Sequence, residues 1–416
     1  MEWPQADVDV AEAWADSGAQ WLTAGGVAVP VRMIAGVVGL VKQLDERGAG
    51  LADHNGAAGL GVLSNRAALL GLGPSGRASC GGVTRLVQAA DEWIAIALAR
   101  PDDVCALPAW LGIEPDDPAL DDAEGPWLLV AAQVAQRSAT EVVERGAMLG
   151  LACSVVSESD HGDGGSPVLM ARLGDARSRP LEGLRVANLA SLWAGPLCAD
   201  VLRCLGAEVV SVESVGRPDG ARATPKWFAS LHADQRSVAV DLRDEGEVAQ
   251  LADLLRSADV VIEGSRPRAL EQIGIDAVEL VGVGPQVWLS ITGHGRQPPG
   301  SARVAFGDDA AAAGGLVGRL VDGPVFLADA IADPLTGVTA AASIVDRLER
   351  GGRWMVDVAL SRVAACAASR PDDPVVDART DPRPPRAMVG DLLPAALGHD
   401  TACVLTEWGS RRRSDL

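Results

Sequence analysis

Aromatic residues are scarce in this chain, at 3% of its 416 residues, and tyrosine is absent. Alanine and glycine are used heavily instead, so we expect cores of small side chains in which helices and strands pack closely. With 48% hydrophobic and 22% charged residues, the composition is that of a globular chain. The length is sufficient for two or three domains, each with its own core.

Basic residues are also in short supply. The chain has 36 Lys and Arg residues against 56 Asp and Glu residues, a formal net charge of −20. Nucleic acids and anionic membranes repel a protein of this charge, so we expect neither as a partner. An anionic ligand would need a local basic pocket.

Long apolar runs and paired cysteines are missing as well. No stretch of about 18 uncharged apolar residues occurs, and no charged-then-apolar leader opens the chain. The cysteines are odd in number and form no CxxC pair, so we expect neither a disulfide framework nor a metal site, and a reducing cytoplasm is the natural compartment. The seven are Cys80, Cys105, Cys153, Cys198, Cys204, Cys366 and Cys403.

Phosphate-binding fingerprints are absent from the first strand-to-helix turn of the central region. "LASLWAGPLCAD" (189–200) has neither GxGxxG nor GxxxxGK[ST]. An NAD-dependent oxidoreductase is therefore disfavoured. "VGVG" (281–284) precedes Pro285 and is interpreted as a turn.

Two stretches read as connectors, because Gly, Ser, Asp and Pro oppose regular structure there. They are 157–180 and 370–386. The resulting division is a part with small-domain character at 1–160, a linker at 161–180, a domain at 181–369, a Pro-rich linker at 370–392 and a closing segment at 393–416.

The central part alternates between strand and helix patterns. Strands are predicted at 184–190, 207–213, 236–242, 259–264 and 286–293, and helices at 195–206 and 245–258. Such alternation favours an α/β fold, a Rossmann-like parallel sheet with helices on both faces. Ligands of these sheets bind beyond the carboxyl ends of the strands. In the N-terminal part, "DEWIAIAL" (91–98) predicts a strand of a smaller α+β domain.

Several motifs occur in the order in which the family III CoA-transferases have them. They include "LEGLRVANLASLWAGPLCADVLRCLGAEVVSVES", "DVVIEGSRPRALEQIGID", "LSITGHG", "FGDDAAAAGGL" and "FLADAIADPLTG". The central region therefore resembles this family over about 190 residues. The resemblance implies transfer of coenzyme A from an acyl-CoA to a carboxylic acid acceptor, with CoA as a substrate and no metal.

The flanks resemble the same family in an unusual order. "GGVTRLVQAADEWIAIALARPDD" (81–103) is similar to its small domain, which normally follows the large one, and "PAALGHDTACVLTEWG" (394–409) is similar to its closing segment. Family members form interlocked dimers, so the resemblance implies a homodimer. The rearranged order leaves a hetero-oligomer or a compact dimer without interlocking open.

The resemblance assigns the nucleophile to Asp333 in "ADPLTG". Asp333 lies four residues before Gly337, the family's spacing, whereas Asp329 lacks that spacing and is expected to be structural or to support the site. From local sequence alone, Asp333 followed by Pro334 is equally a helix cap. The two roles are compatible, because a helix N-terminus stabilises a carboxylate.

The residues that the resemblance places at the CoA site follow the strands. For the phosphates, Arg266, with Arg268 beside it, and Arg236 match basic positions of the family; the alternative for each is a solvated surface charge. Trp193 either contacts CoA or packs in the core, and Gly195 either lets CoA approach the backbone or begins a helix. The remaining residues assigned to the CoA site are Gly293, His294 and Gly337.

Some positions depart from the family pattern. Ser214 replaces a common basic residue, and Asn188 replaces a common Asp that we interpret as structural. Phe306 stands where the family's racemases have a His, so two-base racemisation is disfavoured. Gly81 and Gly82 are either a loop covering the active site or a plain turn. These departures keep open a noncatalytic CoA-binding or assembly subunit with the same fold.

Overall fold

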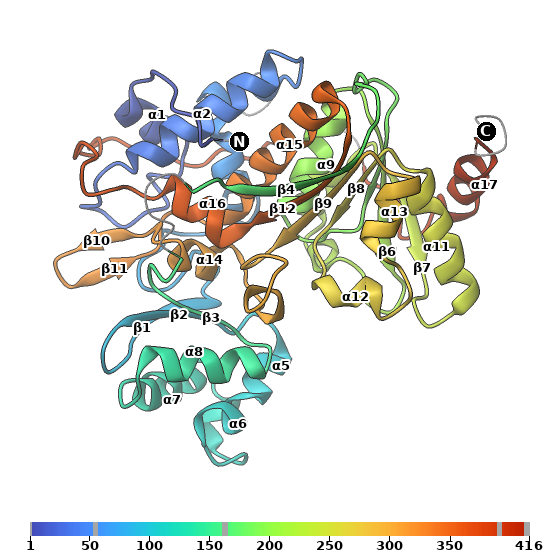
Figure 1. Ribbon diagram of the computed structural model, residues 1–416. Coiled ribbons are helices and arrows are strands. Elements are labelled where there is room, and N and C mark those ends of the chain that lie inside the picture. The colour runs from blue at the N-terminus through green and yellow to red at the C-terminus, as the bar shows by residue number, and fades with distance from the viewer. Residues whose placement is uncertain (1, 53–56, 160–164, 389–392, 412–416) are drawn as a thin grey trace.

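The computed structural model describes residues 2–52, 57–159, 165–388 and 393–411. Its centre is a seven-stranded sheet of order β4-β12-β9-β8-β5-β6-β7, parallel except for the edge strand β4, which runs antiparallel to β12 (Figure 1). The strands are β4 (Val168–Gly174), β5 (Arg185–Asn188), β6 (Glu208–Ser214), β7 (Arg236–Val240), β8 (Val260–Glu263), β9 (Val287–Thr292) and β12 (Arg353–Ala359).

Helices cover both faces of this sheet. They are α9 (Ala194–Cys204), α10 (Pro225–His232), α11 (Glu245–Ser257), α12 (Pro267–Glu271), α13 (Ala277–Val283), α15 (Ala332–Arg350), α16 (Leu360–Ala367) and α17 (Thr401–Arg411), with the 3₁₀ turns η3 (Gly220–Ala223) and η4 (Gly300–Ala302). Consecutive strand residues point to opposite faces: Val186 packs in the core of α9 and α15, and Ala187 in that of α11, α13 and α17. Parallel strands buried on both sides explain the continuous apolar runs.

The predicted α/β alternation is confirmed, and each predicted central strand and helix forms within a few residues of its expected bounds. Two interpretations were wrong. The expected connector at 161–180 contains β4, because its backbone pairs with β12 at the sheet edge and Val168 is buried in the core. "VGVG" includes the end of α13 instead of a free turn, because Leu280 and Val281 are buried against the sheet.

A smaller α+β unit lies below the large sheet in Figure 1. Its antiparallel sheet has the order β1-β2-β3, and its helices pack on one core with it. The elements are β1 (Thr84–Gln88), β2 (Trp93–Ala97), α5 (Pro101–Cys105), α6 (Leu107–Leu111), η2 (Pro118–Asp121), α7 (Gly125–Val134), α8 (Ala139–Met148) and β3 (Ala152–Val155).

The residues before this unit belong to the large core instead. They form α1 (Val10–Asp16), α2 (Val31–Asp45), η1 (Ala57–Leu63) and α4 (Asn65–Leu70). Trp14, Met33 and Leu63 are buried in the same cluster as α9 and α15. In Figure 1, α2 lies beside α15 and α16, and α1 packs on α2. The expected single unit at 1–160 is therefore divided: its first part completes the large domain, and its second forms the small one.

Three remaining elements join the two units: α14 (Gly307–Ala313) and the hairpin of β10 (Gly318–Leu320) and β11 (Gly323–Val325). Leu86 and Ala95 of the small sheet pack against Ala312 and Phe326. Residues 370–388 form neither helix nor strand; the expected linker at 370–392 extends beyond them, and 389–392 lie outside the described residues. Among the described helices, none combines the length and apolar character needed to cross a membrane.

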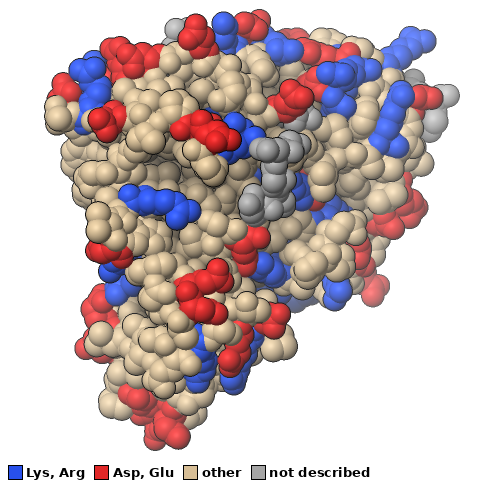
Figure 2. Space-filling model, turned by 60° about the vertical axis from the view of Figure 1, so that its left-hand side comes forward, with Lys and Arg blue, Asp and Glu red and all other residues tan. Residues whose placement is uncertain are grey.

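The space-filling view shows how charges are distributed on one face (Figure 2). Basic side chains appear there in small groups with acidic ones among them, and acidic side chains gather at the lower tip, where the small unit lies.

Candidate active site

The turn that leads into α15 carries the two aspartates of "ADAIADPLTG". Ala328 and Ala330 have φ values of 49° and 41°, a left-handed conformation that is uncommon for residues with a Cβ. Asp329 lies between them, and Asp333 lies in the first turn of α15. Backbone strain at two such residues persists only where surrounding contacts impose the conformation, and strained residues are common at functional sites.

The surrounding contacts come from the N-terminal part of the chain. The Thr23 hydroxyl accepts a hydrogen bond from the Ala328 N–H at 3.0 Å, and the Ser75 hydroxyl donates to the Phe326 carbonyl at 3.0 Å. The Cys80 thiol lies 3.1 Å from the Ala328 carbonyl. The aspartate turn is therefore enclosed by a segment far away in sequence.

Asp333 is partly buried, and its side chain faces the start of α14. Burial raises the pKa of Asp333 to about 7; Arg66 and a hydrogen bond from the Gly307 amide act in the opposite direction, and Asp329 adds to the increase. A Cβ at Gly307 would lie 2.4 Å from Asp333 Oδ2. Only glycine therefore lets this amide approach the carboxyl group so closely.

Three further aspartates share the region. Asp329 accepts a hydrogen bond from Arg66 Nη1 at 2.7 Å, Asp308 accepts from the Ala330 N–H at 2.9 Å, and Asp309 accepts from the Phe306 N–H at 2.7 Å. Burial raises the pKa of all three, that of Asp308 well above its usual range and that of Asp309 to about 7, while Arg66 opposes the increase at Asp329. Burial therefore favours the protonated form of these carboxyl groups.

Arg66, on α4, connects these aspartates to Trp193. Its guanidinium lies 5.6 Å from the Trp193 ring centroid while its Nη1 pairs with Asp329. Trp193 is buried and makes an edge-on contact with Trp227, with centroids 5.0 Å apart. The structure thus brings Trp193 and Asp329 together through an arginine that the sequence analysis did not identify.

The loop that carries Trp193 follows β5 at the carboxyl edge of the sheet. Asn188 accepts a hydrogen bond from the Ala190 N–H at 3.1 Å, a turn-forming contact that fits the structural interpretation of this residue. A Cβ at Gly195 would lie 2.1 Å from the Ala190 Cβ, so glycine is required there. Gly337 serves close packing too: a Cβ would lie 2.9 Å from the Ala194 carbonyl oxygen.

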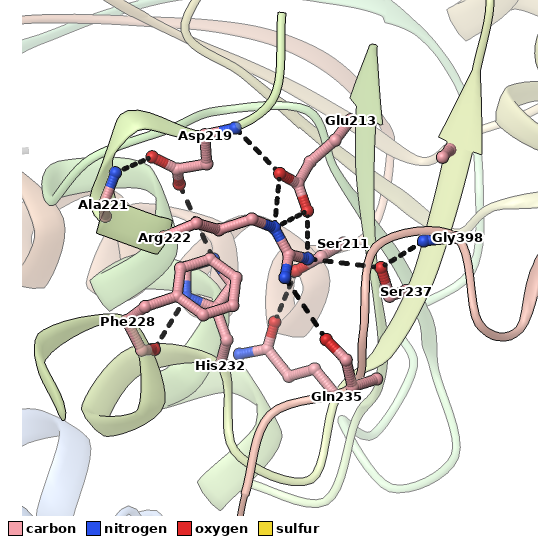
Figure 3. Close-up of polar contacts among 12 residues, drawn as sticks. Ser211, Glu213, Asp219, Ala221, Arg222, Phe228, His232, Gln235, Ser237 and Gly398 are labelled. Carbon is pink, nitrogen blue, oxygen red and sulfur yellow. Dashed lines mark hydrogen bonds and ion pairs between the residues drawn. The ribbon is translucent and has the colours of Figure 1, made fainter. Parts of the chain in front are cut away.

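A polar network centred on Asp219, Glu213 and Arg222 (Figure 3) is connected to this loop through Leu192. The Leu192 N–H donates to both oxygens of Asp219 at 3.1 Å, and Leu192 has a φ of 70°. Asp219 in turn faces His232, and its own N–H donates to Glu213, which forms a bidentate pair with Arg222. Burial lowers the pKa of His232 to about 4, so its imidazole is neutral.

The two predicted phosphate-binding arginines lie apart. Arg266 follows β8 at the carboxyl edge, where its Nη2 comes within 3.4 Å of a Cβ placed on Gly150 of the small unit. Arg236 begins β7 at the opposite, amino edge, and its Nη1 pairs with Glu208 at 3.0 Å and Glu407 at 2.6 Å. Arg268, next to Arg266, is exposed.

Gly293 and His294 follow β9, also at the carboxyl edge. A Cβ at Gly293 would lie 2.7 Å from the Ala305 Cβ, so the loop passes close to the segment before α14. Burial, together with Arg303, lowers the pKa of His294 to about 3. In the described part of the chain its Nε2 has no hydrogen-bond partner. His294 is therefore a neutral ring whose Nε2 is buried without a partner among the described residues.

The glycine pair at 81–82 is exposed and lies next to the aspartate turn through Cys80. Gly82 has a φ of 73° and donates its N–H to the Ser79 carbonyl at 2.8 Å, which makes the segment a turn. A Cβ on either glycine would meet nothing within 4 Å. Both sequence interpretations, a plain turn and a cover of the site, remain compatible with this position.

Known proteins match part of this chain. The sequence model of CoA-transferase family III matches residues 181–389. Succinyl-CoA:glutarate CoA-transferase of Mus musculus is 31% identical over 205 residues, 45% of this chain and 47% of its own length. Succinyl-CoA--D-citramalate CoA-transferase of Chloroflexus aurantiacus is 28% identical over 198 residues, 44% and 49% of the two chains.

A solved structure, that of a CAIB/BAIF family protein from Brucella suis, is 28% identical, covers 45% of this chain and 55% of its own, and has a TM-score of 0.41. The chain spans about half the length of the two curated relatives above. The family match covers slightly more than half of the 416 residues, so this chain belongs to CoA-transferase family III.

Proposed function

We propose that this protein transfers coenzyme A from an acyl-CoA to a carboxylic acid acceptor, with Asp333 as the covalent nucleophile. The observation that carries the proposal is the position of Asp333. It is a partly buried aspartate in the first turn of α15, with a pKa of about 7, inside the family-matched region. At that pKa a substantial fraction of the carboxyl group is ionised at neutral pH, and desolvation makes the ionised form a stronger nucleophile.

The proposed reaction has two symmetric halves. The Asp333 carboxylate attacks the thioester carbonyl, the C–S bond breaks, and CoA leaves as a thiolate with a mixed anhydride remaining. The thiolate then attacks the Asp333 carbonyl carbon and expels the donor carboxylate, which leaves an aspartyl-CoA thioester. The acceptor carboxylate attacks this thioester, the C–S bond breaks, and CoA thiolate leaves with a second mixed anhydride remaining. The thiolate then attacks the acceptor's acyl carbon, which forms the new acyl-CoA and expels the Asp333 carboxylate. Holding the thiolate and the acceptor close by is the main task of the protein.

Other residues are assigned by where they lie. Gly307 would donate its amide N–H to the Asp333 carboxyl group, including the oxyanion formed when the thiolate attacks it. Arg266 at the carboxyl edge would contact the CoA phosphates. Arg236 is a weaker candidate, because Glu208 and Glu407 already neutralise it at the opposite edge. Trp193, Gly195, Gly293 and His294 would line the CoA path on the loops after β5 and β9.

Trapping the intermediate tests this function. After incubation with an acyl-CoA, hydroxylamine should convert the aspartyl thioester to a hydroxamate detectable on the Asp333 peptide by mass spectrometry. Asp333→Asn should remove this adduct and reduce CoA exchange by at least about 10³-fold. Asp346→Asn, on the last turns of the same helix, is the matched control and should retain both. Undiminished exchange in the Asp333 variant would refute the nucleophile.

The alternative is a noncatalytic CoA-binding or assembly subunit. The neutralised Arg236 and the serine at 214 favour it, since both weaken the positive charge available to CoA phosphates. One matching relative, of Chloroflexus aurantiacus, is itself named as an alpha subunit of a CoA-transferase. CoA binding without any adduct or exchange, in the trapping experiment, would support this alternative.

Assembly and location complete the proposal. We expect a homodimer, interlocked as in the family; a compact dimer without interlocking and a hetero-oligomer are the alternatives. All seven cysteines lie in described parts of the chain and are free thiols. Seven free thiols support a reducing, cytoplasmic location, because cysteines stay reduced in that compartment.

A further inference from the structure

Arg66 belongs to a part of the chain that the family match does not include. It lies on α4, far before residue 181, yet its Nη1 is 2.7 Å from Asp329 Oδ1 and its guanidinium lies over Trp193. About 27% of the Arg66 side chain is exposed, whereas that of Asp329 is 1% exposed. One guanidinium therefore contacts both the aspartate turn and the proposed CoA loop.

We propose that Arg66 is a positioning residue for Asp333. By pairing with Asp329 and lying over Trp193, it joins the turn before α15 to the loop after β5 and sets the charge around the nucleophile. The inference deepens the function proposed above and rests on it for the role of Asp333.

A purely structural ion pair explains the arrangement less well. Burying a carboxylate costs solvation free energy, and an apolar pair of similar volume would pack as well. The second oxygen of Asp329 has no hydrogen-bond partner in the described part of the chain, so the pair is also incompletely satisfied. The turn is strained at Ala328 and Ala330, on both sides of Asp329. These costs are explained if the positive charge of Arg66 is needed close to Asp333.

The groups that face Asp333 come from three elements. Arg66 approaches from α4, Asp329 from the turn, and Asp308 and Asp309 from α14 together with the Gly307 amide. Arg66 lowers the pKa of Asp333 and Asp329 raises it. Removing one charge or the other should therefore move the titration of Asp333 in opposite directions, which simple loss of packing would not do.

The test is a titration of Asp333 by ¹³C NMR on aspartate-labelled full-length protein, with the resonance assigned by its absence in Asp333→Asn. Arg66→Met should raise the pKa of Asp333 by about one unit, and Asp329→Asn should lower it by a similar amount. Arg66→Lys keeps the charge and should shift the pKa less than Arg66→Met. The double variant should lie between the two single variants and does not leave a buried charge unpaired.

Arg77 provides the matched control. It also pairs with an aspartate, Asp322 at 2.9 Å, and lies 4.9 Å from the centroid of a tryptophan, Trp93. Arg77→Met should leave the titration of Asp333 unchanged. Shifts of the Asp333 pKa in the same direction in Arg66→Met and Asp329→Asn, or no shift in either variant, would overturn the inference.

The NMR titration needs no catalytic turnover, so it stands apart from the trapping experiment. If Asp333→Asn remains fully active, the proposed function fails while the titration still reports on Arg66. If trapping succeeds, the acid limb of the kcat/KM profile should follow the same order, moving to higher pH in Arg66→Met and to lower pH in Asp329→Asn.

Discussion

At the scale of the residue, the cost of holding Asp333 out of water should be measurable as stability. Burial raises its pKa to about 7 in the folded protein, from about 3.8 when free. The folded state therefore binds the proton more tightly, and this group makes the protein less stable as pH rises from about 4 to 7. Asp333→Asn removes that loss: its free energy of unfolding should exceed that of the wild type by roughly 1–3 kcal/mol at pH 8. Chemical denaturation at pH 5 and pH 8 measures the difference, which should shrink at the lower pH. Asp253→Asn, on the exposed side of α11, should change stability by less than about 0.5 kcal/mol at either pH, and an equal gain for Asp333→Asn at both pH values would contradict the expectation.

At the scale of the element, the contact between α15 and α9 sets the position of the candidate site. Gly337 permits it, because a Cβ there would lie 2.9 Å from the Ala194 carbonyl oxygen and 3.0 Å from the Leu197 Cβ. Gly337→Ala should lower the free energy of unfolding by about 1–2 kcal/mol, since overpacking outweighs the gain in helix propensity. The control is Gly282→Ala on α13, where a Cβ would meet nothing within 4 Å. That variant should be more stable than the wild type by about 0.5–1 kcal/mol in the same urea titration; a stabilised Gly337→Ala would mean that the two helices can separate without cost.

At the scale of the whole molecule, the N-terminal residues are part of the large domain's core. Trp14, Met33 and Leu63 are fully covered by packing against the region of α9 and α15. A fragment of residues 165–416 should therefore expose a wide apolar surface and aggregate, and co-expression with residues 1–159 should rescue it in part. Light scattering of the intact chain should give about twice its mass of 42.8 kDa, as expected for the proposed homodimer. If the fragment of residues 165–416 is instead monomeric and unfolds cooperatively, the N-terminal part is a separate domain.

The central elements were predictable because their signals are local. The strands at β5 to β9 and the helices α9 and α11 each show the spacing of apolar residues that burial on a sheet or helix face requires. The position of Asp333 in the first turn of a helix also followed from its local sequence. The strand β4 was missed, since a single antiparallel edge strand has a short, half-exposed apolar pattern among Gly, Arg and Asp residues.

The roles of Arg66 and of Asp308 and Asp309 around Asp333 were not predictable in the same way. Arg66 meets Asp329 across 263 positions of sequence, and nothing in its own neighbourhood distinguishes it from a surface arginine. Arg236 shows the reverse case: its match to a basic position was local, but its partners Glu208 and Glu407 come from other elements. Ion pairs between distant segments depend on the assembled fold.

The sequence by itself determined the α/β class and the family resemblance, because these rest on periodicity and on motif spacing within short stretches; the preference for Asp333 over Asp329 rests on the same spacing and stays a prediction. The tertiary structure alone decided that the N-terminal part is split between two cores, that a strained turn carries Asp329, and that one arginine joins that turn to Trp193. Those features depend on which distant surfaces exclude water together, and that is settled only when the whole chain is packed.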